Sequence, residues 1–440
     1  MAGVMPFRGT RFNPSVVSDV QKCVAMPYDR IKHGLQDKYY ASHEFNICRI
    51  TKGKEYPDDT DSNNVYTRSG QYLRDWSAKH VFMEDGEPAI YAYYQEFNVD
   101  GKKMVRRGYC AMVELEDYGK GVKPHEKTLD APKEDRFKLL VQTDTHFGQI
   151  FQLYPDDANE VAEILAPFCE REPDVCTTID EEPGVVHKLW AVTDKGVIAR
   201  LQAAMRDRLL FIADGHHRYE TAINYRNHRL AEYTGGPDGH SPKYAMMTMV
   251  GMSDPGLVVL PTLRIIHGLP NFDFDKFLRD LETHFTVEPC ANIDEMQKKL
   301  DEAASDKSRN AFGLYRGGKY WYFELTDQDI MQKVAPEHTD DWRSLDVAVL
   351  HEVVLEKILG ISKEAQAAKT NISYERDRAK GHELVANGSH QFLIFMNPTL
   401  MTQIRDVAGK GEVMPQKSTD FYPKLITGLV MCKVDLGEKK

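Results

Sequence analysis

The sequence FIADGHHRYETA (residues 211–222) gives the clearest indication of the fold. Residues 209–213 are all apolar, which is typical of a short buried strand, whereas residues 219–233 have the periodicity of a helix. A further helical pattern precedes the strand at residues 197–208. The segment DGHHR (214–218) is therefore expected to join a strand directly to the start of a helix.

A junction of this kind is a typical anion-binding site. The first N–H groups of a helix have no partners within it, and the helix dipole is positive at that end. Gly215 lets the backbone approach a ligand closely, and the Arg218 guanidinium presents two parallel donors to a phosphate. Asp214 can cap the turn or hold Mg²⁺, while His216 and His217 can donate hydrogen bonds to phosphate. The alternative interpretation is a capped helix with surface histidines.

The composition is that of an ordinary globular protein. The chain has 440 residues, of which 42% are hydrophobic and 28% charged. No apolar run approaches the roughly 20 residues that span a bilayer, and residues 1–13 lack a signal-peptide pattern, so we expect a cytoplasmic protein. The seven cysteines include no C-x-x-C pair, which argues against a zinc ribbon or a thioredoxin-like motif.

The charge balance argues against nucleic acid as a partner. The formal net charge is −11 and the isoelectric point is near 5.8. Proteins that hold nucleic acid through its phosphates usually carry a basic surplus or a basic stripe. The sequence shows neither feature, so we expect small-molecule ligands, no membrane contact and no nucleic acid. A homo-oligomer is compatible with the sequence.

Helices and strands mix along the chain without strict alternation, which predicts an α+β (mixed α/β) fold. Asp100-Gly101 predicts a hairpin turn within residues 89–115, and Gly317-Gly318 predicts a second turn within residues 311–325. We expect a strand at 148–154, a helix at 156–169, an exposed acidic connector or linker at 170–184, and a helix at 344–359.

We expect three regions. Residues 1–120 form an N-terminal α+β region that contains the hairpin at 89–115. Residues 121–265 form the phosphate-binding core, and residues 266–440 form a C-terminal α+β region.

Two motifs resemble those of free L-serine kinases of the ParB/sulfiredoxin-like superfamily. The first is DGHHR (214–218) between a strand and a helix, and the second is VKPHE (122–126), which precedes it. In those kinases the Lys-Pro-His-Glu segment carries a catalytic glutamate, which corresponds to Glu126 here. The resemblance implies a ParB/sulfiredoxin-like nucleotide-binding core with additional α+β segments. The two motifs cover about ten residues, and their spacing is longer here than in a minimal member.

More broadly, the chain resembles a prokaryotic family known only as a domain of unknown function. This resemblance runs almost end to end but implies no activity. The segments that carry it are residues 24–29, 124–126, 133–136, 214–218, 345–347 and 414–419.

Other members of the superfamily fit less well. Sulfiredoxins place a cysteine where this chain has His216, and the lack of that thiol argues against sulfinic-acid repair. ParB-type proteins use a related loop but bind DNA, which the acidic balance disfavours. A phosphotransferase is the reaction class that remains.

Three weaker groups of residues complete the candidate site. Tyr28 and Asp29 follow a rigid proline and can hold an amino group or a ribose, although a structural turn is an equal alternative. Residues 133–136 begin an amphipathic helix whose Arg136 can face phosphates, although a solvated helix face is the commoner arrangement. Residues 409–419 nearly match a P-loop but have Gln416 where the second glycine belongs, which disfavours a Walker fold. The residues of this loop that can still contact phosphate are Lys417, Ser418 and Thr419.

The sequence therefore predicts a kinase that transfers a phosphoryl group from ATP or ADP, with Mg²⁺, to a small hydroxyl-bearing metabolite, free L-serine above all. Phosphoryl transfer requires positioning, charge neutralisation and a base for the acceptor hydroxyl. Glu126 is the expected base, Asp214 the expected Mg²⁺ ligand and second catalytic residue, and His125 a substrate contact. Two alternatives stay open: a non-catalytic ParB-like nucleotide-binding regulator, and a phosphate-ester hydrolase.

Overall fold

The computed structural model describes residues 3–32, 34–126, 130–306 and 308–440. The chain forms two compact units. The first comprises Met1–Lys123, Thr128–Val258 and Pro423–Lys440, and the second comprises Pro124–Lys127 and Val259–Tyr422.

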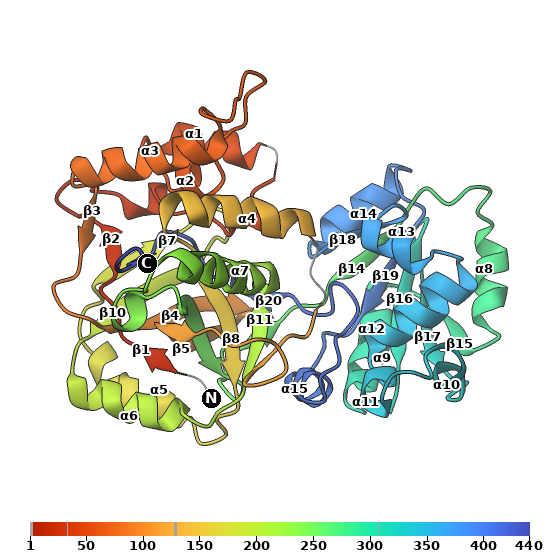
Figure 1. Ribbon diagram of the computed structural model, residues 1–440. Helices are drawn as coiled ribbons and strands as arrows, with labels where there is room; N and C mark the ends of the chain where they lie inside the picture. Colours follow the sequence, from red (N-terminus) through yellow and green to blue (C-terminus); the bar gives the residue numbers. More distant parts are fainter. Residues whose placement is uncertain (1–2, 33, 127–129, 307) are drawn as a thin grey trace. The chain divides into compact units, whose positions relative to one another are not determined.

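A mixed nine-stranded sheet forms the centre of the first unit (Figure 1). Along the sheet the strands follow the order β6-β11-β8-β12-β5-β4-β10-β9, and β1 pairs with β5. The β6–β11 and β8–β12 pairs are parallel, whereas the other pairs in this sheet are antiparallel. The strands are β1 (Val4–Met5), β4 (Ile90–Val99), β5 (Lys102–Glu114), β6 (Val122–Lys123), β8 (Ile150–Tyr154), β9 (Val175–Thr178), β10 (Val186–Val192), β11 (Leu210–Asp214) and β12 (Tyr244–Gly251).

Helices pack on this sheet and on one another. Apolar residues of α5, α6 and α7 join those of the central strands in one buried core, and Figure 1 shows α5 and α6 beside the sheet. Helix α4 lies along α7 and also contacts α3. The helices of this unit are α1 (Leu35–Ser42), α2 (Cys48–Thr51), α3 (Val65–Ala78), α4 (Asp130–Thr143), α5 (Glu160–Leu165), α6 (Lys195–Met205) and α7 (His216–Glu232).

Two short strand pairs involve the N-terminal and C-terminal parts of the chain, and both lie in the first unit. Strand β2 (Thr10–Phe12) pairs with β3 (Phe82–Glu84), and β21 (Cys432–Lys433) pairs with β7 (Thr145–His146). Thr10 also bridges to Met431. The C-terminal residues are therefore part of the same unit as the junction between β11 and α7.

The second unit contains an antiparallel six-stranded sheet in the order β15-β17-β16-β19-β14-β18. Apolar side chains of α9 and α14 pack on one face of it. The strands are β14 (Leu263–Ile266), β15 (Phe285–Cys290), β16 (Ala311–Arg316), β17 (Lys319–Leu325), β18 (Ile372–Glu375) and β19 (Phe392–Met396). The helices are α8 (Phe274–Leu281), α9 (Ile293–Ala304), α10 (Ile330–Val334), α11 (Asp340–Arg343), α12 (Asp346–Val349), the π-helix η5 (Leu350–Ile358), α13 (Lys363–Ala368), α14 (Arg378–Ala386) and α15 (Met401–Gly409).

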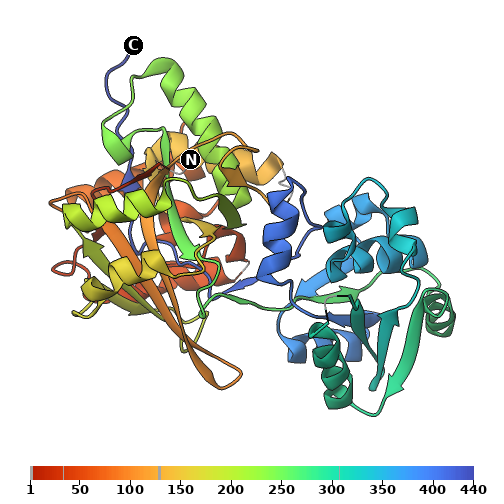
Figure 2. The ribbon, with the colours of Figure 1, turned by 90° about the horizontal axis from the view of Figure 1, so that it is seen from below.

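Both predicted hairpins are present. Strands β4 and β5 turn through Asp100 and Gly101, which adopt positive φ of 49° and 75°. Figure 2 shows this hairpin, in orange, running out beyond the sheet. Strands β16 and β17 turn through Gly317 and Gly318, also at positive φ. The α+β class is confirmed, whereas the ParB/sulfiredoxin-like core remains a prediction.

Three expectations differ from the structure. The boundary expected near residue 120 falls inside the first unit, because β4 and β5 pair with β10 and β12 from beyond it. The expected helix at 156–169 is reduced to α5 followed by a 3₁₀ turn. The connector at 170–184 is not simply exposed, since it contains β9 and buries Ile179 and Glu182.

No helix in the described part of the chain is both long enough and apolar enough to cross a membrane.

Candidate functional site

The junction between β11 and α7 has the predicted strand–glycine–helix form. Strand β11 ends at Asp214, Gly215 adopts a left-handed φ of 97°, and α7 begins at His216. The buried residues Tyr219 and Ala222 join the core of the sheet and fix the direction of the helix. A side chain at residue 215 would place its Cβ 2.9 Å from Nε of Arg218. The positive φ favours glycine here, and any larger residue would push the Arg218 guanidinium away from its position.

Asp214 lies between two cations. Its Oδ2 is 3.3 Å from Nζ of Lys424, and its Oδ1 is 3.7 Å from Nη2 of Arg218. The three side chains are 27%, 9% and 15% exposed, in the order Asp214, Lys424, Arg218. Ion pairs this sheltered from water are screened less than surface pairs. The cluster holds two positive charges and one negative charge.

This arrangement does not fit the expected Mg²⁺ site. Each carboxylate oxygen of Asp214 faces a cation, and a metal ion would be a third positive charge, repelled by the other two. Within the ranges that the structure describes, no group of three or more His, Cys, Asp or Glu residues is placed to hold a metal. The assignment of Asp214 as a metal ligand therefore has no geometric support, and magnesium remains a prediction.

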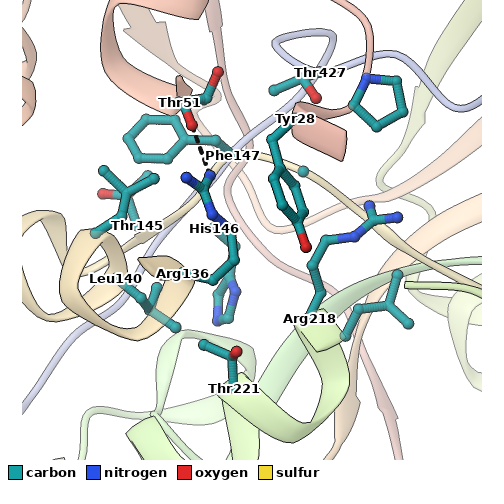
Figure 3. Close-up of a pocket in the computed structure, with 14 residues that line it drawn as sticks. Tyr28, Thr51, Arg136, Leu140, Thr145, His146, Phe147, Arg218, Thr221 and Thr427 are labelled. Atoms are coloured by element: carbon teal, nitrogen blue, oxygen red, sulfur yellow. Dashed lines mark hydrogen bonds between the residues drawn. The ribbon is translucent and has the colours of Figure 1, made fainter. Parts of the chain in front are cut away.

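A pocket opens beside this junction, within the first unit (Figure 3). It encloses about 630 Å³ of space, including the part open to solvent. Leu139, Leu140 and Ile150 supply apolar lining. The polar and aromatic residues that line it are Tyr28 of η2 (Tyr28–Arg30), Thr51 of α2, Arg136 of α4, Thr145 and His146 of β7, Phe147, Arg218 and Thr221 of α7, and Thr427.

Two arginines approach the pocket from different helices. The guanidinium of Arg136 donates from Nη1 to the Thr51 carbonyl at 2.6 Å and from Nε to Asp135 at 3.0 Å. Arg218 donates from Nη1 to the Gln149 carbonyl, and its buried Nε has no hydrogen-bond partner among the described residues. Arg136 is thus neutralised by an adjacent carboxylate, whereas Arg218 shares Asp214 with Lys424 at longer range.

Tyr28 lies between these two guanidinium groups (Figure 3). The guanidinium of Arg136 is 4.3 Å from the centroid of its ring. Burial and then Asp29 raise the pKa of Tyr28 to about 12, against the opposing effect of Arg218 and Arg136. The hydroxyl is therefore a neutral donor at physiological pH. The Asp29 side chain is exposed and does not line the pocket.

The two histidines of the motif are placed differently from the arginine. His216 is buried and His217 is half-buried, and neither lines the pocket. Their role as hydrogen-bond donors to phosphate remains a prediction.

His146, which sequence reasoning missed, is buried in the pocket wall, and burial lowers its pKa to about 4. It is therefore neutral at pH 7.

A second cluster of predicted residues lies in the second unit. Residues 124–127 belong to that unit, and Glu126 bridges to Met414. The main-chain N–H of Lys417 donates to Oε1 of Glu126 at 3.4 Å, and Nε2 of His125 is 2.9 Å from Oγ1 of Thr419. The structure thus brings the VKPHE motif to the loop at 414–419, although about 290 residues separate them in the sequence.

Hydrogen bonds within the second unit hold this loop. Ser418 donates from Oγ to the Pro415 carbonyl at 2.5 Å, and its own carbonyl accepts from Thr399. Arg264, a buried residue that carried no sequence signal, donates to the Lys417 carbonyl at 2.9 Å. The Ser418 hydroxyl thus has a partner inside the loop, and phosphate binding by Lys417, Ser418 and Thr419 remains a prediction.

Sequence reasoning also missed Lys424 and Gln149. Lys424 follows Phe-Tyr-Pro near the C-terminus and belongs to no recognisable motif. Gln149 contacts the site through its main-chain carbonyl, which every residue type carries. No local pattern could have identified either residue.

Comparison with known proteins establishes the family. The family model described as "Protein of unknown function (DUF1015)" matches residues 4–348. The chain belongs to this family. The resemblance expected from residues 24–29 and the other shared segments is thereby confirmed. No curated protein matches the chain.

Several solved structures are weakly similar to this chain. A conserved hypothetical protein from Pyrococcus furiosus is 15% identical, with a TM-score of 0.34 over 72% of this chain and 92% of that one. A free serine kinase in complex with AMP is 12% identical, with a TM-score of 0.37 over 72% and 89%. A C-terminally truncated SbnI from Staphylococcus aureus is 11% identical, with a TM-score of 0.33 over 73% and 81%. At such scores the likeness by itself assigns neither the core fold nor an activity.

Proposed function

We propose that this DUF1015 protein binds the phosphates of a nucleotide at the Tyr28–Arg136–Arg218 pocket and transfers a phosphoryl group to the hydroxyl of a small metabolite. ATP or ADP is the proposed donor, and free L-serine is the proposed acceptor. The observation that carries the proposal is the convergence of two arginines from different helices on one pocket beside the start of α7.

The pocket offers the interactions that a bound phosphate requires. Arginine guanidinium groups match phosphate oxygens in pairs, and the start of a helix adds a favourable dipole. Tyr28 adds a neutral hydroxyl donor between the two arginines. Because catalysis of phosphoryl transfer is mostly positioning and charge neutralisation, these groups are suited to the donor side of the reaction.

Glu126 is the proposed base on the acceptor side. This assignment rests on the motif pair VKPHE and DGHHR, and the Lys417 N–H donates to Oε1 of the Glu126 carboxylate at 3.4 Å. A carboxylate can take the proton of an acceptor hydroxyl. No step is assigned to magnesium, since Asp214 faces two cations.

Product analysis tests this proposal. Purified protein is incubated with L-serine and either ATP or ADP, with and without added MgCl₂, and O-phosphoserine is measured by mass spectrometry. The expected result is nucleotide-dependent O-phosphoserine that is lost in the Arg218→Gln variant. The Arg171→Gln variant is the control, because Arg171 is about half exposed and pairs with Asp174 away from the pocket.

Two further incubations of the same protein, one with O-phosphoserine alone and one with nucleotide and a panel of other acceptors, separate the alternatives. Release of serine from O-phosphoserine without nucleotide would indicate a hydrolase. Nucleotide binding without any product from a panel of hydroxy amino acids and polyols would indicate a regulator. Either outcome would contradict the kinase proposal.

A further inference from the structure

Lys424 reaches the phosphate-loop junction from the far end of the sequence. Its ammonium lies 3.3 Å from Oδ2 of Asp214, the last residue of β11. The side chain is only 9% exposed. Since 210 residues separate the two groups, the fold as a whole places this cation beside the DGHHR motif.

Buried polar side chains fix the main chain at Lys424. Nε2 of Gln95 donates to the Lys424 carbonyl at 2.9 Å, and the Lys424 N–H donates to Oε2 of Glu182 at 3.0 Å. Nη2 of Arg106 donates to the Pro423 carbonyl at 2.6 Å. Both hydrogen-bonding groups of the Lys424 backbone, and the carbonyl before it, are therefore held by side chains from β4, β5 and the 170–184 connector.

Burial of the three side chains that hold this segment costs desolvation free energy. Gln95 and Arg106 are each 1% exposed, and Glu182 is 4% exposed. Burial lowers the pKa of Arg106 to about 10, which reflects the penalty on its charge. Polar groups buried at such cost need partners, and here their partners are main-chain atoms of residues 423 and 424. The result is a lysine whose main chain is held on both sides by hydrogen bonds from buried side chains.

Two cations converge on Asp214 beside the first turn of α7. Lys424 and Arg218 each pair with this carboxylate, at 3.3 Å and 3.7 Å. Cations sheltered from water attract a phosphate more strongly than cations in bulk water. Lysine is a compact charge on a flexible stem, so its ammonium can move from Asp214 toward a phosphate oxygen without backbone change.

We propose that Lys424 is a phosphate-binding residue of the nucleotide site and acts together with Arg218. In the unliganded chain its ammonium rests against Asp214, and in the complex it contacts the phosphates that Arg218 holds. This inference rests on the proposed function and adds a cation from outside the matched family region, which ends at residue 348.

Titration calorimetry with pyrophosphate and with ADP tests the proposal. The Lys424→Met variant should bind both ligands at least about tenfold more weakly, the usual loss for one charge-assisted contact. Lys424→Arg should restore most of that loss, because it returns a cation of similar reach. Lys433→Met is the matched control, since Lys433 is an exposed lysine of the same C-terminal segment. It should bind like the wild type.

The outcomes separate this inference from the function on which it rests. A folded Lys424→Met protein with wild-type affinity for pyrophosphate and ADP would overturn the role of Lys424 and leave the pocket proposal standing. A wild-type protein that binds neither ligand would overturn the proposed function itself. If Lys424→Met does not fold, acetylation of wild-type Lys424 is measured by mass spectrometry. Saturating pyrophosphate should slow it, and an unchanged rate would overturn the inference.

Discussion

The guanidinium of Arg136 stacks on the ring of Tyr28, 4.3 Å from the ring centroid. Cation–π contact of this kind, together with the hydrogen bonds of Arg136 to Asp135 and to the Thr51 carbonyl, holds both side chains in one orientation. Arg218 lies on the other side of the same tyrosine (Figure 3). Tyr28 thus separates two like charges and lets both line one pocket.

Arg218→Lys should weaken pyrophosphate binding although it preserves the charge. Lysine cannot reproduce the donation of Arg218 to the Gln149 carbonyl while also presenting two donors to phosphate. We expect a loss of about 10- to 100-fold in affinity by calorimetry. An affinity equal to that of the wild type would show that Arg218 does not contact the ligand.

Gly215→Ala should disturb the phosphate site as well as the backbone. The residue has positive φ, and an added Cβ would meet the Arg218 guanidinium. Gly101→Ala is a matched control, because Gly101 also has positive φ but a Cβ there meets nothing within 4 Å. Both variants should lose roughly 1 kcal/mol or more of unfolding free energy in urea. Only Gly215→Ala should lose pyrophosphate affinity, and equal affinities would contradict the steric argument.

Acid should destabilise the fold through buried histidines. Burial lowers the pKa of His146 to about 4 and that of His187 to about 3. The unfolded chain then binds more protons than the folded chain below about pH 6.5, so stability is full above that pH and falls as the pH drops toward 4. Each histidine should contribute a loss of roughly 2 kcal/mol between pH 7.5 and pH 5.

Urea unfolding of the His146→Phe variant checks this pH dependence. The variant should lose less stability than the wild type between pH 7.5 and pH 5, whatever its absolute stability. A pH dependence identical to that of the wild type would rule out His146 as one of the titrating groups.

Glu126→Gln should abolish turnover and leave nucleotide binding intact. Removal of a general base typically costs about 10²- to 10⁴-fold in rate. Glu134→Gln is the control, because Glu134 is an exposed carboxylate on α4 that pairs with Lys138. Rates of O-phosphoserine formation and calorimetry with ADP give the two readouts. Loss of ADP affinity together with turnover would place Glu126 in binding rather than in proton transfer.

Local features of the fold were predictable where the sequence alone determines the geometry. Asp100-Gly101 and Gly317-Gly318 form the predicted turns, because positive φ favours these residue types. The junction from β11 to α7 is also as predicted, since an apolar run, a glycine and a helical period follow one another. Of the helix expected at 344–359, residues 346–358 are helical: α12 runs into the π-helix η5, which the periodicity did not reveal.

Long-range partners could not be predicted. Gln95 and Lys424 are 329 residues apart, and their contact depends on how the C-terminal segment enters the first unit. Glu182 is a second example of a long-range partner. It lies in an acidic, proline-containing stretch that we expected to be exposed, but it is buried and accepts a hydrogen bond from the Lys424 N–H. For the candidate site, the sequence identified Arg136, Arg218 and Tyr28, but it gave no sign that Asp214 pairs with Lys424.

A crystal structure of the complex with ADP tests the central claim most directly. The account predicts phosphate density within hydrogen-bonding distance of the Arg218 guanidinium, beside the first turn of α7 and with Arg136 and Tyr28 in the same pocket. Density for ADP bound elsewhere, with this pocket unchanged and unoccupied at saturating ligand, would contradict it.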